Sequence, residues 1–265
     1  MAWFVGVDVG SVATKGVITE DGVVACHHLV PSGFNYGEAA KRLLQELLQR
    51  AGISLSDVAR IVTTGSGAGN AKFEGRQVSE IVCCVRGIQA IFPTVTTVIS
   101  VGGQSSQAIR IGEYGRMADF VVSEKCAAGS ARFLQVIANV LRISLADIGP
   151  LSLKSTNPIM FSTGCAVFGE TEAITRVAEG FSVEDILAGV HQSLANKLSS
   201  LAVKVGLDGE CAICGGGGLD VGLIKSLEMK LGLELLVPPH PQHVAALGAA
   251  VLAQEKEWLS GPTSS

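Results

Sequence analysis

The sequence has few aromatic residues, few charged residues and no block of basic residues. Aromatic residues make up 5% and charged residues 17% of its 265 positions, and the formal net charge is −4. Nucleic acids and anionic membrane surfaces bind basic patches, so this composition argues against both as partners. No apolar run reaches the ~18 residues that a membrane-spanning helix needs. The opening residues, MAWFVGVDVG, lack the basic segment of a signal peptide, so we expect a cytoplasmic protein.

The chain also lacks the cysteine spacing of a disulfide framework. It has seven cysteines, an odd number, so metal ligation or simple burial is expected in a reducing compartment. The pairs Cys83–Cys84 and Cys211–Cys214 are predicted to be buried. Neighbouring residues on a helix point about 100° apart, and residues i and i+3 on a strand face opposite sides, so neither pair has the geometry of a chelate.

A pattern of strands and glycine turns occurs twice along the chain, about 92 residues apart. Each copy reads strand, glycine turn, strand, turn, strand and then helix. The predicted strands of the two copies are 3–9, 12–19 and 23–30, and 97–101, 106–111 and 116–123. A repeat of this size indicates a duplicated αβ domain rather than a solenoid. We predict one domain from residues 1–94 plus 242–265 and a second from 95–241, facing each other across a ligand cleft.

Hydrophobic periodicity and capping residues predict the remaining elements. Further strands are expected at 60–64, 158–162, 211–214 and 234–237. Helices are expected at 38–50, 78–92, 183–205, 221–231 and 244–258, and also after Cys126 and after Cys165. Ser182 and Asp185 have the spacing of a capping box at the start of the longest helix.

Three glycine-rich turns stand at strand ends: Asp8–Ser11, Gly102–Ser105 and Gly215–Gly218. Successive backbone N–H groups in such turns bind phosphate. The chain has neither GxxxxGK[ST] nor a strand-to-helix GxGxxG, so P-loop and Rossmann sites are not expected. In the first turn Asp8 is predicted to hold Mg²⁺, and Ser11, Thr14 and Lys15 to contact phosphate oxygens. The alternative is that Asp8 and Gly10 only shape a tight hairpin.

Cys126 and Cys165 each directly precede a predicted amphipathic helix. A helix N-terminus favours a thiolate. Two such cysteines in each protomer of a two-fold dimer supply four ligands, which is the number that an iron–sulfur cluster needs. The alternative is that both are small buried hydrophobic residues.

Several motifs, in this order, carry a family resemblance: GVDVGSVATKGVI, VTTGSG, SVGGQSS, EKCAAGSARFL, STGCAVFGETEAI, ICGGGGLD and PPHPQHVAALGAAVLA. The sequence resembles the BadF/BadG/BcrA/BcrD-type ATPases, and most of all the activator components of 2-hydroxyacyl-CoA dehydratases. The resemblance covers nearly the whole chain. It implies two duplicated α/β domains of the actin/Hsp70/sugar-kinase (ribonuclease H-like) fold that face a nucleotide cleft.

The resemblance also implies an activity. Members of the family are homodimers that share one 4Fe–4S cluster, whose ligands here would be Cys126 and Cys165 of each subunit. Hydrolysis of ATP to ADP, with Mg²⁺, drives a low-potential electron to a partner acyl-CoA dehydratase or reductase, and ferredoxin or flavodoxin supplies that electron.

The resemblance assigns site residues motif by motif. The residues that match the first phosphate motif are Asp8, Gly10, Ser11, Thr14 and Lys15. Those that match the second are Gly102, Gly103 and Gln104, and those that match the adenosine motif are Gly215 and Gly216. Asp8 and Gln104 are the predicted catalytic residues.

One motif departs from the family pattern. The second phosphate motif commonly reads DIGGQDxK, but here Ser100, Ser105 and Gln107 replace its two carboxylates and its lysine. ATP binding is therefore better supported than ATP turnover. One alternative is a non-hydrolysing subunit of a benzoyl-CoA reductase-type complex, in a heterodimer. Another is an actin-fold small-molecule kinase, but the second hairpin offers no general base for it.

Overall fold

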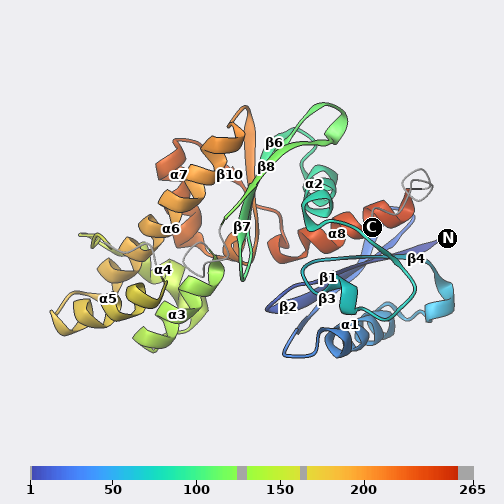
Figure 1. The fold of residues 1–265 in the computed structure, drawn as a ribbon, viewed down its shortest axis with the longest axis horizontal. Coiled ribbons are helices and arrows are strands. Elements are labelled where there is room, and N and C mark those ends of the chain that lie inside the picture. The colour runs from blue at the N-terminus through green and yellow to red at the C-terminus, as the bar shows by residue number, and fades with distance from the viewer. Residues whose placement is uncertain (1, 124–129, 162–165, 256–265) are drawn as a thin grey trace. The chain divides into compact units, whose positions relative to one another are not determined.

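The structure, a computed structural model, describes residues 2–123, 130–161 and 166–255. These residues form two compact units, each with one five-stranded mixed sheet (Figure 1). The described residues of the first unit are 2–94, 112–117 and 242–255, and those of the second lie in 95–111 and 118–241. The sequence places 112–117 in the second domain. In the structure this turn belongs to the first unit, where Gly115 lies against the Gln89 side chain.

The first sheet has the strand order β3-β2-β1-β4-β5. Its strands are β1 (Trp3–Val9), β2 (Ala13–Glu20), β3 (Val23–Pro31), β4 (Val58–Thr64) and β5 (Arg76–Gln77). The helices of this unit are α1 (Tyr36–Ala51), α2 (Glu80–Ile91) and α8 (Val244–Gln254). β1 pairs antiparallel with β2 and parallel with β4, so it lies at the centre of the sheet.

The second sheet has the strand order β10-β9-β6-β7-β8. Its strands are β6 (Val95–Val101), β7 (Ser106–Ile111), β8 (Met117–Val122), β9 (Glu210–Gly215) and β10 (Leu235–Leu236). The helices are α3 (Ala131–Leu141), α4 (Ile148–Ser152), α5 (Ala166–Ala178), α6 (Val183–Val205) and α7 (Val221–Leu231). The central strand β6 pairs antiparallel with β7 and parallel with β9.

The two sheets are copies of one topology, which confirms the predicted duplication. Read from β8, the second sheet has the same order as the first read from β3. The pairing register matches as well: Asp8 is opposite Lys15 in the first sheet, and Ser100 is opposite Gln107 in the second. Equivalent positions can therefore be compared residue by residue.

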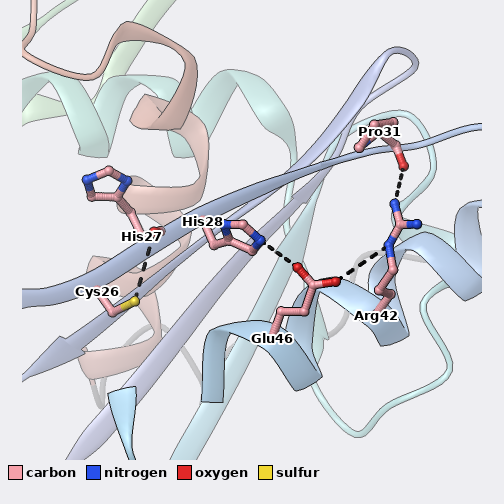
Figure 2. A network of polar contacts seen from close by, with 6 residues as sticks. All are labelled: Cys26, His27, His28, Pro31, Arg42 and Glu46. Carbon is pink, nitrogen blue, oxygen red and sulfur yellow. Dashed lines mark hydrogen bonds and ion pairs between the residues drawn. The ribbon is translucent and has the colours of Figure 1, made fainter. Parts of the chain in front are cut away.

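Apolar packing and a polar clamp hold α1 on the first sheet. Alternate residues of β1, including Val5 and Val7, pack with Leu43 and Leu47 of α1, and all four side chains are fully buried. Figure 2 shows the clamp at the edge of this core: His28 Nε2 lies 2.6 Å from Glu46 Oε2. Arg42 of the same helix donates to the Pro31 carbonyl over 3.0 Å.

The core of the second unit lies between its sheet and the long helix α6. Ile99 and Val101 of β6 share a buried cluster with Ile186 and Val190 of α6 and with Phe133 of α3. The α6 residues recur at helical spacing, which is the pattern that predicted this helix. Its observed bounds equal the predicted bounds.

One predicted strand is absent. Residues 158–161 form neither helix nor strand, and 162 lies outside the described residues. The Ile159 N–H donates to the Asp185 carbonyl of α6 instead of to a strand. The Asp185 carboxylate accepts from Ser155 Oγ and from the Asn157 N–H, at 2.6 and 3.0 Å. A short apolar segment has therefore packed along a helix rather than joined a sheet.

The predicted capping box at α6 is half formed. Ser182 Oγ accepts from the Asp185 N–H at 3.1 Å, as expected. The Asp185 carboxylate, however, is held by the Ser182 and Ser155 hydroxyl groups and by the Asn157 N–H. The hydrogen bonds from Ser155 and then Ser182 lower the pKa of Asp185 to about 2.

No single helix in the described ranges is long and apolar enough to cross a membrane. One pair of segments, Ala131–Leu141 and Leu145–Ser152, has the length and composition of a span only when taken together, and it is bent by 105°.

Candidate functional site: two glycine turns and the helix that follows Cys126

An ion pair occupies the end of the central strand in the first unit. Asp8 is the second-last residue of β1, and its Oδ2 lies 2.7 Å from Nζ of Lys15 on β2. The Asp8 residue is 4% exposed, and the Lys15 side chain is 16% exposed. Burial alone would lower the pKa of Lys15, but the Asp8 carboxylate more than offsets that effect, and the pKa is raised. The Asp8 carboxylate therefore keeps the Lys15 ammonium charged beside the Gly10–Ser11 turn.

The second oxygen of Asp8 has different surroundings from the first. Asp8 Oδ1 is buried and has no hydrogen-bond partner among the residues described. A buried carboxylate oxygen without a partner is unfavourable, and Mg²⁺ prefers such hard oxygen ligands, directly or through water. This donor atom therefore fits the magnesium ion that the sequence predicts. Lys15 would stand next to the phosphate that this ion accompanies.

Gly65 makes room for the Asp8 carboxylate. It follows β4, which pairs with β1, and its φ is +90°. A Cβ at this position would collide with Asp8 Oδ1 and would lie 2.7 Å from the Val9 carbonyl oxygen. Sequence reasoning noted Gly65 only within a motif and did not assign it to the site.

The other residues of the first phosphate motif have two different surroundings. Ser11 is half-buried in the turn itself. Thr14 is fully buried, and its Oγ1 lies 2.8 Å from Oγ of Ser32, which donates in turn to the Gly10 carbonyl. These hydrogen bonds give Thr14 a part in shaping the turn. Its predicted contact with phosphate stays a prediction.

Glu80 adds a second carboxyl group that the sequence analysis missed. It is the first residue of α2, and its charge interacts with those of both Asp8 and Lys15. Burial and then the Asp8 carboxylate raise the pKa of Glu80 to about 7, against the opposing effect of Lys15. The only sequence signal was an acidic residue directly after Ser79 at a helix start, which is a common feature of helices.

The equivalent turn of the second unit carries no charge at these positions. Ser100, 4% exposed, stands where Asp8 stands, and its register partner is Gln107. Gly102 and Gly103 form the turn, closed by a 3.0 Å hydrogen bond from the Gly102 N–H to the Ser105 carbonyl. Gln104 is exposed at the tip of this turn.

The third glycine turn lies beside the second. Val101 of β6 pairs with Gly215 at the end of β9, so the Gly102 turn and the Gly215–Gly218 loop share one edge of the sheet. Gly215 has a φ of +79°, and a Cβ there would lie 2.5 Å from the Val101 carbonyl oxygen. The structure therefore brings the predicted second phosphate motif and the predicted adenosine motif together within one unit.

The Gly102 turn is tied directly to the helix that follows Cys126. The Ala131 N–H, at the start of α3, donates to the Gly102 carbonyl over 2.9 Å. Ser130 Oγ donates to the Gly103 carbonyl over 3.3 Å. A displacement of this turn would therefore be passed on to the start of α3.

The helices that follow the two predicted ligand cysteines pack on each other. Phe133 of α3 is buried and lies against Gly169 of α5, where a Cβ would lie 2.7 Å from the ring. Cys126 and Cys165 themselves lie outside the described residues. Their role as cluster ligands stays a prediction.

The remaining cysteines are poor ligands, as expected. Cys83, Cys84, Cys211 and Cys214 are buried, and Cys26 is half-buried. Burial raises the pKa of Cys83 and of Cys211 to about 12, which disfavours the thiolate that a metal binds. In the described part of the chain, no three His, Cys, Asp or Glu side chains are grouped to hold a metal ion.

Comparison with known proteins gives several relatives. The chain is 38% identical, over 95% of its length and 96% of the relative's, to the (R)-2-hydroxyglutaryl-CoA dehydratase activating ATPase of Acidaminococcus fermentans. It is 32% identical to the solved activator of the 2-hydroxyisocaproyl-CoA dehydratase from Clostridium difficile with bound ADPNP, with a TM-score of 0.91. That match covers 99% of this chain and 100% of the other.

A more distant likeness concerns the fold alone. A ROK family glucokinase from Streptomyces griseus is 13% identical, with a TM-score of 0.57 over 96% of this chain and 99% of the other. The predicted actin and sugar-kinase fold is thereby confirmed. The model of the BadF/BadG/BcrA/BcrD ATPase family matches residues 5–253, and this chain belongs to that family.

Proposed function

We propose that this protein is an ATP-dependent electron-transfer activator. It binds ATP with Mg²⁺, and two copies share one 4Fe–4S cluster through Cys126 and Cys165 of each. A low-potential electron passes from ferredoxin or flavodoxin, through this protein, to a partner acyl-CoA dehydratase or reductase. The named relatives activate 2-hydroxyacyl-CoA dehydratases, which supports that class of partner. All of these components would meet in the cytoplasm.

The first turn supports the binding of Mg²⁺ and phosphate. Asp8 Oδ1 is a buried carboxylate oxygen that lacks a partner within the described part of the chain, and Lys15 holds its positive charge beside it. Together they would orient a triphosphate and neutralise charge that develops when its terminal phosphoryl group moves to water. Glu80, protonated in part near neutral pH, lies within the field of both.

The observation that carries the proposal is the link from the Gly102 turn to α3. Two hydrogen bonds, from the Ala131 N–H and from Ser130 Oγ, connect this turn to the helix that follows Cys126. A phosphate group bound at the turn would change the position of those carbonyl groups. The start of α3 would move with them, and this movement would change the surroundings of Cys126, which precedes the helix.

Cys126 and Cys165 are the thiols best suited to a cluster. The five described cysteines are buried or half-buried, which leaves these two for soft-metal ligation. Two ligands from each of two protomers satisfy the four-thiolate requirement. A 4Fe–4S cluster held there would supply a one-electron carrier whose potential responds to its surroundings.

A non-hydrolysing subunit is the second candidate, and one observation favours it. Ser100 and Gln107 replace a carboxylate and a lysine at the register positions that Asp8 and Lys15 occupy in the first unit. Such a subunit would bind ATP and pair with a second, competent chain. ATP hydrolysis by the purified protein alone, at a rate that Asp8→Asn abolishes, would exclude it.

Iron and acid-labile sulfide per dimer test the proposal. The protein is purified without oxygen, as wild type and as Cys126→Ala and Cys165→Ala, with Cys214→Ala as the matched control. We expect about four iron and four sulfide per dimer in the wild type and the control. Cys126→Ala and Cys165→Ala should each lose this iron and sulfide, together with the absorbance at about 400 nm. Wild-type protein without iron would contradict the proposal, and so would retention of iron by Cys126→Ala or Cys165→Ala.

A further inference from the structure

A fully buried histidine lies under the start of α7 in the second unit. His191 of α6 is 0% exposed, and its Nε2 lies 3.1 Å from Oδ2 of Asp220. Asp220 is the N-cap of α7, and its Oδ1 accepts from the N–H groups of Gly222 and Leu223 at 2.9 and 3.0 Å. One carboxylate therefore caps one helix and accepts a hydrogen bond from another.

The pairing fixes the state of the imidazole. With the Asp220 carboxylate as the acceptor, the tautomer that fits this contact carries its proton on Nε2 and donates it to Asp220. Nδ1 is buried and has no hydrogen-bond partner among the described residues. The imidazole thus makes one directed polar contact, and that contact is with Asp220.

The surrounding residues form a slot that fits the ring. A Cβ on Gly222 would lie 2.7 Å from His191 Nδ1 and would also collide with Ser152 Oγ. On the other side, a Cβ on Gly149 would lie 2.7 Å from Asp220 Oδ1. Ser152 Oγ itself donates to the Gly149 carbonyl over 2.8 Å. Small residues of α4 and α7 therefore leave space for the imidazole and for the carboxylate that it meets.

Asp220 also ends the glycine loop that precedes α7. Its N–H donates to the Gly217 carbonyl over 3.2 Å. Gly217 packs against Val101, the last residue of β6, and against Leu223 of α7. The path from His191 to the loop consists of one side-chain hydrogen bond and one backbone hydrogen bond, both through Asp220.

We propose that His191 is a positioning residue for the adenosine moiety of the bound nucleotide, because it fixes Asp220 and, through Asp220, the Gly215–Gly218 loop. The inference rests on the proposed function, since it assumes that this loop receives adenosine. It concerns only the adenosine part of ATP, because the groups assigned to phosphate lie in the other two turns. Loss of the His191 contact should therefore weaken ATP binding and leave triphosphate binding unchanged.

Titration calorimetry of the full-length protein, purified without oxygen, tests this with two probes, Mg·ATP and Mg·tripolyphosphate. His191→Leu removes the donor and keeps an apolar side chain in the slot. We expect its affinity for ATP to fall on the order of tenfold or more, and its affinity for tripolyphosphate to change less than about twofold. His191→Gln retains an N–H donor at the position of Nε2, so it should restore ATP affinity to within about threefold of wild type.

Two further variants keep the test decisive. Asp220→Ser preserves a helix cap but is too short to reach the imidazole, so it should reproduce the His191→Leu result even if His191→Leu does not fold. His28→Leu removes a half-buried histidine–carboxylate pair, with Glu46 in the first unit (Figure 2), and should leave both affinities unchanged.

Three results would overturn the inference. If the His191 and Asp220 variants lose stability but keep the wild-type ratio of ATP to tripolyphosphate affinity, His191 only supports the fold. If both affinities fall together, the effect is not specific to adenosine. If the wild-type protein binds tripolyphosphate but shows no preference for ATP, the proposed adenosine loop is wrong and the inference fails with it.

Discussion

At the end of its central strand the first unit places Asp8 opposite Lys15, whereas the second unit places Ser100 opposite Gln107. The strand order and the pairing register are the same in both. Each sheet also has a glycine with positive φ at the end of the parallel neighbour of that strand: Gly65 directly follows β4, and Gly215 is the last residue of β9. The two copies therefore share one backbone topology but differ in charge at equivalent positions.

This difference separates two tasks. The charged turn has an unpartnered carboxylate oxygen and a lysine, which suit Mg²⁺ and phosphate. The neutral turn has uncharged side chains and backbone groups, and its Gly102 and Gly103 carbonyl groups accept hydrogen bonds from the start of α3. We infer that the first turn carries the chemistry and that the second turn transmits nucleotide occupancy.

The largest effect is expected from Asp8→Asn. The change removes the predicted Mg²⁺ ligand and leaves the Lys15 charge without its partner, so ATP hydrolysis should fall by ~100-fold or more. Stability should fall by about 3–5 kcal/mol, as for other broken buried ion pairs. Ser100→Ala, the same position in the other unit, should change hydrolysis less than about threefold. Equal effects at the two positions would refute the division of tasks. ATPase assays and urea unfolding give the two readouts.

Gly65→Ala and Gly215→Ala compare the two glycines. Both force a side chain into positive φ and against a carbonyl oxygen, so each should cost about 1–3 kcal/mol of stability in urea unfolding. Only Gly65→Ala should also displace the Asp8 carboxylate, and so lower the affinity for Mg²⁺ more than the affinity for nucleotide without metal. A Gly65→Ala protein that binds Mg·ATP as the wild type does would show that Asp8 does not hold the ion.

Restoring charge to the second turn tests the comparison in the opposite direction. Ser100→Asp alone buries an unpaired carboxylate and should destabilise the protein. Adding Gln107→Lys should recover part of that loss, with a coupling energy of about 0.5–3 kcal/mol in a double-mutant cycle. If the missing carboxylate limits turnover, the double variant should hydrolyse ATP about tenfold faster than the wild type. An unchanged rate would show that the neutral turn does not limit hydrolysis.

The raised pKa of Glu80 predicts that the stability of the protein depends on pH through a group in the first unit. Its pKa is raised by burial from 4.5 to about 7, so between these pH values the folded protein binds more protons than the unfolded chain. Stability should therefore fall as pH rises from about 4.5 to about 7. Glu80→Gln should remove this slope. The variant should therefore have a higher free energy of unfolding than the wild type at pH 8, but not at pH 5. Glu38→Gln, an exposed acid in the first turn of α1, serves as the control and should leave the slope intact. A wild-type slope that survives Glu80→Gln would contradict the assignment.

The smallest effect is expected at Cys214, the residue opposite Ser100 on the neighbouring strand. It is buried and is not a predicted ligand, so Cys214→Ala should leave iron content and ATP hydrolysis unchanged. Loss of iron in this variant would assign a ligand role to the strand cysteines.

Local sequence signals predicted most of the fold because alternation and glycine turns act within a few residues. Strand Ser106–Ile111 and helices Val183–Val205 and Val221–Leu231 have their predicted bounds. The prediction for residues 158–161 was wrong because a short apolar segment has the same sequence pattern whether a sheet or a helix covers it. Its partner, Asp185, lies more than twenty residues away in sequence.

The site was predicted only in part, because some of its contacts join residues that are distant in sequence. The glycine turns and Asp8 stand out as motifs, whereas Glu80 and His191 acquire their surroundings only through folding. The sole sequence signal for His191 was its place beside the apolar face of Val190 and Leu194. Its partner Asp220 caps a different helix, α7, and no rule of sequence spacing relates the two residues.

The central claim is that nucleotide bound at these turns alters the surroundings of Cys126. The most direct test is the midpoint potential and electron paramagnetic resonance spectrum of the reduced protein, purified without oxygen, with no nucleotide, with Mg·ADP and with Mg·ATP. We predict that the wild-type potential and spectrum differ among these three conditions and that Asp8→Asn abolishes the difference. An iron-containing wild-type protein whose potential and spectrum are identical in all three would contradict the claim.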